Sequence, residues 1–303
     1  MEDDALKKIL TVLAVGLLCL LLAAGCGSQQ QRGERKDFTI VTSFYPMYID
    51  VLNITKGIDG VKVVNMTKPQ TGCLHDYQLT TEDMKTLEQA DVFVVNGAGM
   101  EAFLDKARKQ QKLKVIEASD NPDISFITDD GEDNPHVWMS VTYAIAQVQT
   151  ITSKLCEADP DHADAYRKNA LEYCTKLEDL KKEMHAQLDD LPHKDIVTFH
   201  EAFPYLAKEF HLNIVSVIEH EPGTDPSPQE LEATISAVNR MPVKVLFTEP
   251  QYSPAAAETI ARETGAGIYT LDPVVTGEAD ERAADAYIET MKRNMDVLKQ
   301  ALQ

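Results

Sequence analysis

The segment from residue 161 to residue 190, DHADAYRKNALEYCTKLEDLKKEMHAQLDD, decides the fold of this chain. It is long, highly charged and helical in pattern, and no strand signal occurs between Val137 and Leu191. At a rise of 1.5 Å per residue, a single helix of this length would span about 45 Å, the size of a whole lobe. We therefore predict a rigid connector between two lobes; two shorter helices with a break between them are the alternative.

On both sides of this segment, short β-like runs alternate with helical patterns. Strands are predicted at residues 38–44, 61–66, 91–96 and 114–118 before it, and at 196–199, 213–218, 244–248 and 267–271 after it. Helices are predicted at residues 81–90, 143–156, 202–210, 227–240, 254–264 and 279–302. Such alternation is typical of parallel sheets covered by helices. The predicted fold is α/β, with two lobes, each a four-stranded parallel sheet with flanking helices, joined by one long rigid helix.

The N-terminus has the layout of a secretory signal, with two lysines before an apolar run over residues 9–24. That run is shorter than the roughly 20 residues that a membrane span needs. The ending LAAGC at residues 22–26 resembles a bacterial lipoprotein signal, in which Cys26 would carry the lipid. An uncleaved membrane anchor is the alternative.

These features predict the organisation of the whole chain. The predicted parts are a lipoprotein signal peptide at 1–25, a flexible tether at 26–37, an N-terminal lobe at 38–158, the connecting helix at 159–191 and a C-terminal lobe at 192–303. The tether is too poor in apolar residues to fold. We therefore expect an extracytoplasmic protein, anchored through its lipid to the bacterial cell membrane.

Net charge and cysteine content limit the classes of protein to which this chain can belong. The net charge of −20 argues against a nucleic-acid partner, because phosphates would be repelled; it concentrates cations without creating a specific site. Besides Cys19 in the leader and Cys26 at the predicted lipid site, only Cys73, Cys156 and Cys174 remain, which is no disulfide framework. Cys156 and Cys174 could pair only if they lie on neighbouring helices. Cys73 is either a soft metal ligand or a buried structural thiol, and the second interpretation is favoured.

Four side chains follow predicted strands or close the loops after them: His75, His136, His200 and Asp272. In open α/β sheets, ligands bind outside the carboxyl ends of the strands, so these four should converge where two sheets face each other. Three imidazoles and one carboxylate suit a divalent cation, with zinc favoured by the nitrogens. Taken singly, each histidine is better explained as a hydrogen-bonded loop residue, and it is their joint placement that favours a metal site.

Further side chains are candidates for supporting such a site. Asp76 and Glu201 each follow a predicted ligand and are candidates for orienting imidazoles from behind. Glu249 ends a strand and is a third supporting candidate, which would bind backbone or support the interface between the lobes. His220 is a weaker candidate for contact with the metal. The acidic loop at residues 128–133 is expected to be a disordered charged loop rather than a cation collector.

The sequence contains no zinc-protease His-Glu-x-x-His, no Gly-x-Ser-x-Gly elbow, no Walker loop and no Gly-x-Gly-x-x-Gly fingerprint. We therefore expect a binding protein and not an enzyme. Two alternatives stay open. One is a secreted metallohydrolase with Glu201 or Glu249 as its base, and the other is a surface protein for cell adhesion that uses the metal structurally.

Together these segments make the chain similar to a known family. The markers are TSFYP at 42–46, HDY at 75–77, ADVFVVNG at 90–97, NPHVW at 134–138, HEAF at 200–203, FTEPQ at 247–251 and LDP at 271–273. They resemble the solute-binding lipoproteins of ATP-binding-cassette (ABC) metal importers, the zinc and manganese group, over nearly the whole mature chain.

The resemblance implies a two-lobe fold with a metal cleft, and a non-catalytic, monomeric receptor that passes its metal to an ABC permease in the cytoplasmic membrane. It implies His75, His136, His200 and Asp272 as ligands. Manganese-type members carry glutamate where this chain has His200, so Zn²⁺ is expected and Mn²⁺ is the alternative. The loop before His136 is acidic, whereas zinc-type members often have a histidine-rich loop there.

Overall fold

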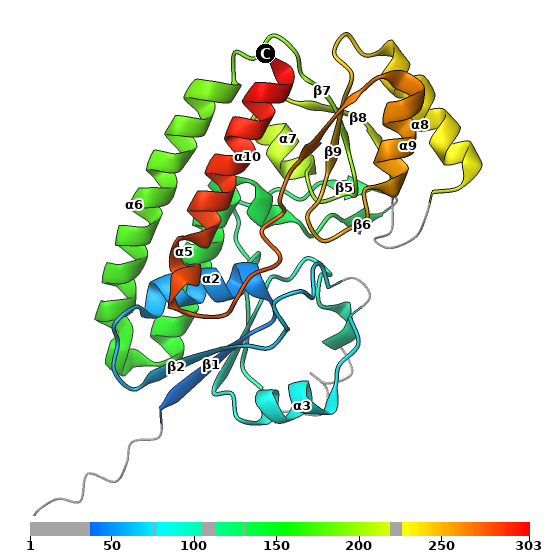
Figure 1. Cartoon of the computed structure of the whole chain (residues 1–303). Helices are drawn as coiled ribbons and strands as arrows, with labels where there is room; N and C mark the ends of the chain where they lie inside the picture. The colour runs from blue at the N-terminus through cyan, green and yellow to red at the C-terminus, as the bar shows by residue number, and fades with distance from the viewer. Residues whose placement is uncertain (1–36, 75–76, 105–112, 130, 219–225) are drawn as a thin grey trace, which may run out of the picture. The chain divides into compact units, whose positions relative to one another are not determined.

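A computed structural model describes residues 37–74, 77–104, 113–129, 131–218 and 226–303 (Figure 1). The predicted signal peptide, Cys26 and the tether up to residue 36 lie outside the described residues, as do His75, Asp76 and His220. Within the described part of the chain, no helix combines the length and the apolar character that crossing a membrane requires.

Two four-stranded parallel sheets form the framework, and every predicted strand is confirmed within a residue or two of its expected ends. The first sheet contains β1 (Phe38–Thr42), β2 (Val61–Asn65), β3 (Val92–Val95) and β4 (Val115–Glu117) in the order β2-β1-β3-β4. The second contains β7 (Asp195–Thr198), β8 (Asn213–Val217), β9 (Val245–Thr248) and β10 (Gly267–Thr270) in the order β8-β7-β9-β10. The two halves therefore share one topology, although their sequences show no repeat.

The central strands are apolar because helices cover both of their faces. All four residues of β3 are buried, and so are all four of β9. The covering helices are α2 (Tyr45–Thr55), α3 (Thr81–Glu88), α5 (Val141–Ala158), α7 (Pro204–Glu209), α8 (Pro228–Arg240), α9 (Ala255–Thr264) and α10 (Ala286–Leu302). Short 3₁₀ turns are η1 (Ala102–Leu104), η2 (Val137–Met139), η3 (Pro160–His162) and η4 (Glu281–Asp285).

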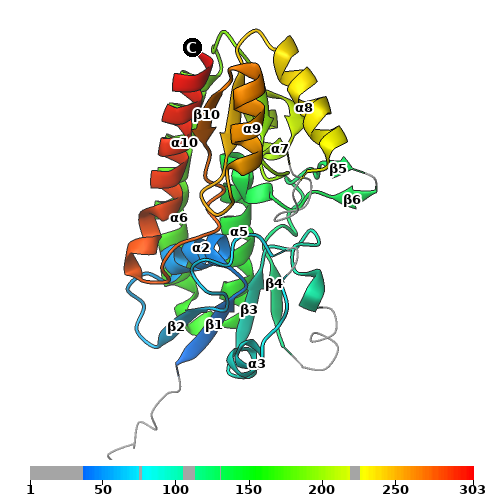
Figure 2. The ribbon, with the colours of Figure 1, turned by 45° about the vertical axis from the view of Figure 1, so that its right-hand side comes forward.

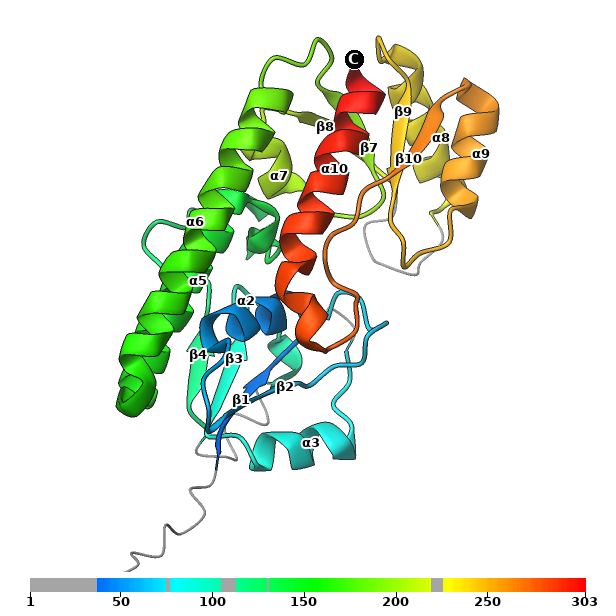
Figure 3. The ribbon, with the colours of Figure 1, turned by 60° about the vertical axis from the view of Figure 1, so that its left-hand side comes forward.

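The predicted connector is a single helix, α6 (Ala163–Leu188), preceded by the short turn η3. Its 26 residues correspond to about 39 Å. Buried positions such as Tyr166, Tyr173 and Leu180 recur every three or four residues, so one stripe of this charged helix faces the protein. That stripe packs on α5, α2 and α10, and Figure 3 shows α6 running past both sheets. The alternative of two helices with a break is therefore wrong.

The C-terminal segment returns to the first half of the chain, which the sequence did not predict. Helix α10 packs along α6, and the turn η4 packs on α2. Asn53 on α2 donates a hydrogen bond from Nδ2 to the carbonyl oxygen of Ala284, at 2.8 Å. The last helix thus ties the second half of the chain to the first.

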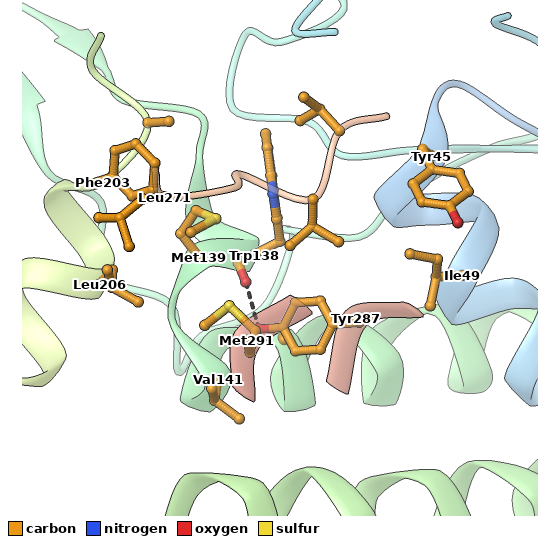
Figure 4. Packing of buried hydrophobic residues seen from close by; sticks show 14 of the residues in the cluster. Tyr45, Ile49, Trp138, Met139, Val141, Phe203, Leu206, Leu271, Tyr287 and Met291 are labelled. Carbon is orange, nitrogen blue, oxygen red and sulfur yellow. Dashed lines mark hydrogen bonds between the residues drawn. The ribbon is translucent and has the colours of Figure 1, made fainter. Parts of the chain in front are cut away.

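One apolar core serves both sheets. It includes Ile40 and Val94 from the first sheet, Ile196 and Phe247 from the second, and Trp138 from the turn η2. Figure 4 shows the surroundings of Trp138, whose carbonyl oxygen accepts a hydrogen bond of 2.7 Å from the Tyr287 hydroxyl. Because packed interiors resist deformation, a shared core limits how far the two halves can move apart.

The acidic loop differs from the prediction. Instead of being disordered, it contains a short antiparallel ribbon of β5 (Thr128–Asp129) and β6 (Glu132–Asp133) (Figure 2). Gly131 has a φ of +86°, a value that glycine adopts without strain because it has no Cβ atom. This conformation permits the tight turn between the two strands. The hydroxyl of Tyr205 accepts from the Ile127 amide at 3.0 Å and donates to the Asn134 carbonyl at 2.7 Å, which ties both ends of the ribbon to α7.

Candidate metal centre

His200 lies at the point where the strand order of the second sheet reverses. Strand β7 ends two residues before His200, and the neighbouring strand β9 ends one residue before Glu249. Both side chains are buried, and the Nδ1 atom of His200 is hydrogen-bonded to Oε1 of Glu249. Gln251 Nε2 donates to the other carboxylate oxygen at 2.8 Å. A carboxylate at Nδ1 holds the proton on that nitrogen, so the lone pair of the ring is on Nε2.

His136 is oriented in the same way by a different residue. Its Nδ1 lies 3.1 Å from Oδ1 of Asn134, which also accepts from the His136 backbone amide at 3.0 Å. The Asn134 amide nitrogen donates to the carbonyl oxygen of Glu201 at 2.9 Å, which fixes the amide orientation. His136 therefore also presents an Nε2 lone pair. Sequence reasoning missed Asn134, although its place two residues before a predicted ligand was a usable signal.

The two Nε2 atoms converge on the sulfur of Cys73. The Sγ atom lies 3.6 Å from Nε2 of His136 and 3.5 Å from Nε2 of His200. Both imidazoles are 1 % exposed, and all three donor atoms lie within 4.8 Å of one another. Burial raises the pKa of the Cys73 thiol, and the nearby Glu249 carboxylate raises it further. The favoured interpretation of Cys73 as a purely structural thiol did not foresee this contact.

Asp272 follows β10 and is held by backbone contacts. Its Oδ1 accepts from the Val274 amide at 2.8 Å, and Asn294 on α10 bonds both to its amide (2.9 Å) and to its carbonyl oxygen (2.8 Å). Burial raises the pKa of this carboxyl, opposed by the Val274 amide and by Arg293. Its carboxylate is not in the group of mutually close donor atoms found among the described residues.

The segment of Asp272 is nevertheless tied to that of His136. Trp138 Nε1 donates to the carbonyl oxygen of Pro273 at 2.8 Å, and the Trp138 ring lies 5.3 Å from the His136 ring. Val274 is held at a φ of +64°, which is costly for a β-branched residue. Such strain persists only where the surrounding structure fixes the backbone, so this segment is firmly positioned.

Two of the three predicted supporting acids, Glu249 and Glu201, lie in the described part of the chain. The Glu249 carboxylate contacts the predicted ligand His200 directly, as described above. Glu201 acts through its backbone instead: its carbonyl oxygen accepts a hydrogen bond from the Asn134 side chain, which in turn orients His136.

The other two cysteines of the described residues lie away from this cluster. Cys156 on α5 and Cys174 on α6 are free thiols that line a groove of about 500 Å³ between these helices. They are therefore on neighbouring helices, as pairing would require, but they do not form a disulfide in this structure. This groove is separate from the cluster of Cys73, His136 and His200.

Two α/β halves of one topology, a single connecting helix and a buried cluster of imidazoles define a metal-binding solute-binding protein. The chain belongs to the family described as zinc-uptake complex component A, periplasmic (ZnuA), which matches residues 40–301. This is a family of binding proteins of uptake systems and not of enzymes, which confirms the expectation of a non-catalytic protein and sets the metallohydrolase alternative aside.

Named relatives agree with this assignment. The chain is 33 % identical to the high-affinity zinc uptake system protein ZnuA of Bacillus subtilis, covering 94 % of this chain and 95 % of that protein. It is 30 % identical to the zinc-binding lipoprotein AdcA of Streptococcus pneumoniae over 97 % of this chain, but spans only 61 % of that longer protein. Among solved structures, FpvC of Pseudomonas aeruginosa in complex with Mn²⁺ has a TM-score of 0.78 and 33 % identity, covering 88 % of this chain and 99 % of FpvC.

Proposed function

We propose that this chain is a monomeric extracytoplasmic receptor that binds Zn²⁺ with high affinity and delivers it to an ABC permease in the cytoplasmic membrane. The observation that carries this proposal is the convergence of two buried Nε2 atoms whose rings are each fixed from behind, by Asn134 and by Glu249. Neutral imidazoles held in this way are typical zinc ligands. We propose His75, His136, His200 and Asp272 as the ligand set.

Zinc is preferred over manganese in this proposal because of the donor atoms. Imidazole nitrogen suits zinc, whereas manganese favours carboxylate, carbonyl and water oxygens. The Mn²⁺ complex of FpvC shows that a structural relative can hold the harder cation, so manganese is the alternative to be tested.

The proposal includes a small conformational change on binding. The single connector α6 and the core shared by both sheets oppose a wide hinge movement. We expect the radius of gyration measured by X-ray scattering to change little between apo and zinc-loaded protein. A large domain rotation on zinc binding would contradict this expectation.

The proposed location depends on Cys26. Its place at the end of the apolar leader supports lipid attachment, as does the lipoprotein name of the pneumococcal relative. We expect Cys26→Ala to move the protein from the membrane fraction to the soluble fraction of the producing cell. Wild-type protein that incorporates no labelled fatty acid would argue against the anchor.

The test of the whole proposal is a competitive titration of Zn²⁺ against Mn²⁺ on wild type and His200→Ala. We expect one tight site that prefers zinc and that is weakened about tenfold or more by the substitution. His193→Ala is the matched control, since His193 lies in the turn after α6 and outside the cluster. A preference for manganese would support the receptor function but contradict the choice of zinc. Metal binding that does not depend on His200 would contradict the proposed ligand set. Metal that cannot be removed without unfolding would favour the adhesion alternative.

A further inference from the structure

The spacing of Cys73 from the two imidazoles matches the edge of a zinc coordination tetrahedron. With a Zn–S bond of about 2.3 Å and Zn–N bonds of about 2.0–2.1 Å, a tetrahedral angle places sulfur and nitrogen about 3.6 Å apart. The Sγ–Nε2 separations in the structure are 3.6 Å to His136 and 3.5 Å to His200. The sulfur therefore already lies at the distance from each nitrogen that one zinc ion would impose, and all three donor atoms lie within 4.8 Å of one another.

The orientation of the rings supports the same arrangement. Each imidazole has its Nδ1 directed to an oxygen acceptor, on Asn134 for His136 and on Glu249 for His200. The atoms that face the sulfur are consequently the two Nε2 atoms that carry lone pairs. A thiol has a single proton to share between two such nitrogens, whereas a divalent cation would bind the sulfur and both nitrogens together.

The loop that carries Cys73 is fixed at several points. Leu74, the next residue, is fully buried in the main core. A turn closes between Lys68 and Thr71, whose amide donates to the Lys68 carbonyl oxygen at 3.1 Å. The carbonyl oxygen of Pro69 accepts from the Gly277 amide at 3.0 Å, which ties this loop to the C-terminal segment. The thiol is thus held in place and is not a mobile surface group.

We infer that Cys73 is itself a metal ligand, binding through its sulfur the same zinc ion as His136 and His200. This inference rests on the proposed function and deepens it, because it names a sulfur donor among the ligands. Zinc takes four ligands in closed sites, so Cys73 would take the place of one member of the four-residue set proposed above. A sulfur donor favours zinc and disfavours manganese, which gives Cys73 a role in selectivity.

X-ray absorption at the zinc edge tests the inference without any substitution. Reduced wild-type protein loaded with one equivalent of Zn²⁺ should show a sulfur shell at about 2.3 Å beside the nitrogen and oxygen shell at about 2.0–2.1 Å. Cys73→Ser should lose the sulfur shell and bind manganese better relative to zinc than wild type does. The matched control is the double variant Cys156→Ser/Cys174→Ser, which removes the thiols of the separate groove and should keep the shell.

The possible results of these experiments distinguish a failure of the Cys73 ligand from a failure of the proposed receptor function. Tight zinc binding that depends on His200 but shows no sulfur shell would overturn the role of Cys73 and leave the receptor intact. A sulfur shell that survives Cys73→Ser and disappears in the double variant would likewise overturn it. Wild-type protein with no tight zinc site would overturn both. Cobalt-loaded protein gives an independent readout, because a sulfur-to-cobalt charge-transfer band should be present in wild type and absent in Cys73→Ser.

Discussion

The contact between Glu249 and His200 makes a graded prediction for metal affinity. Glu249→Gln keeps an oxygen that can accept from the Nδ1–H group of His200 but removes the negative charge. A hydrogen bond to a charged acceptor contributes about 1.5–3 kcal/mol and a neutral one about 0.5–1.5 kcal/mol. The loss of about 1–1.5 kcal/mol corresponds to roughly tenfold weaker zinc binding, since about 1.4 kcal/mol is a factor of ten.

Glu249→Ala should weaken binding further, towards about 100-fold, which is the upper range for residues that orient a ligating histidine. Without an acceptor at Nδ1, the buried ring of His200 is free in the apo protein to adopt the other tautomer, and zinc binding must reverse that choice. The expected order of affinity is therefore wild type, then Glu249→Gln, then Glu249→Ala.

The assay is competition for zinc with a chromophoric chelator at fixed pH. Glu258→Gln, an exposed acid on α9, is the matched control for the loss of one negative charge. Thermal unfolding of each apo variant establishes that affinity is compared between folded proteins. An affinity of Glu249→Ala equal to that of wild type would refute the reasoning, because His200 would then bind metal without being oriented by Glu249.

Three further predictions follow from neighbouring contacts. Trp138 is the only tryptophan and its ring lies 5.3 Å from the His136 ring, so zinc binding should change its fluorescence, and His136→Ala should abolish that change. Asn134→Ala should weaken zinc binding about tenfold in the same chelator competition, whereas Asn134→Asp, which keeps the acceptor, should be closer to wild type. Burial raises the pKa of Glu101 from 4.5 to about 7. Its contribution to the free energy of unfolding is therefore fully present below pH 4.5 and is lost as the pH rises to about 7, and Glu101→Gln should flatten this slope in denaturant titrations of the apo protein at pH 5 and pH 7.5.

Binding itself should also depend on pH. Since metal ligation requires neutral imidazoles and releases their protons, zinc affinity should fall as the pH is lowered. Chelator competition at a series of pH values measures this effect. It differs from the Glu101 effect in sign, because lower pH weakens metal binding but favours the fold through Glu101.

Sequence alone determined the local structure of this protein. The strands were recoverable because each is a short apolar or β-branched run, and α6 because its buried stripe repeats with the period of a helix. His136, His200 and Asp272 were selected because they follow strands or close the loops after them, and ligands collect at the carboxyl ends of parallel strands.

Only the tertiary structure decided how these side chains meet. Cys73 is 63 residues from His136 and 127 from His200, yet its sulfur lies close to the Nε2 atoms of both. The partners that fix each ring, Asn134 and Glu249, likewise act through side-chain directions that no periodicity encodes. The strand order and the return of α10 to the first half also depend on packing between segments far apart in the chain. Local sequence patterns specify which face of an element is apolar, but distances between donor atoms follow from how whole elements pack, and this is why the sulfur at the candidate site emerged only from the fold.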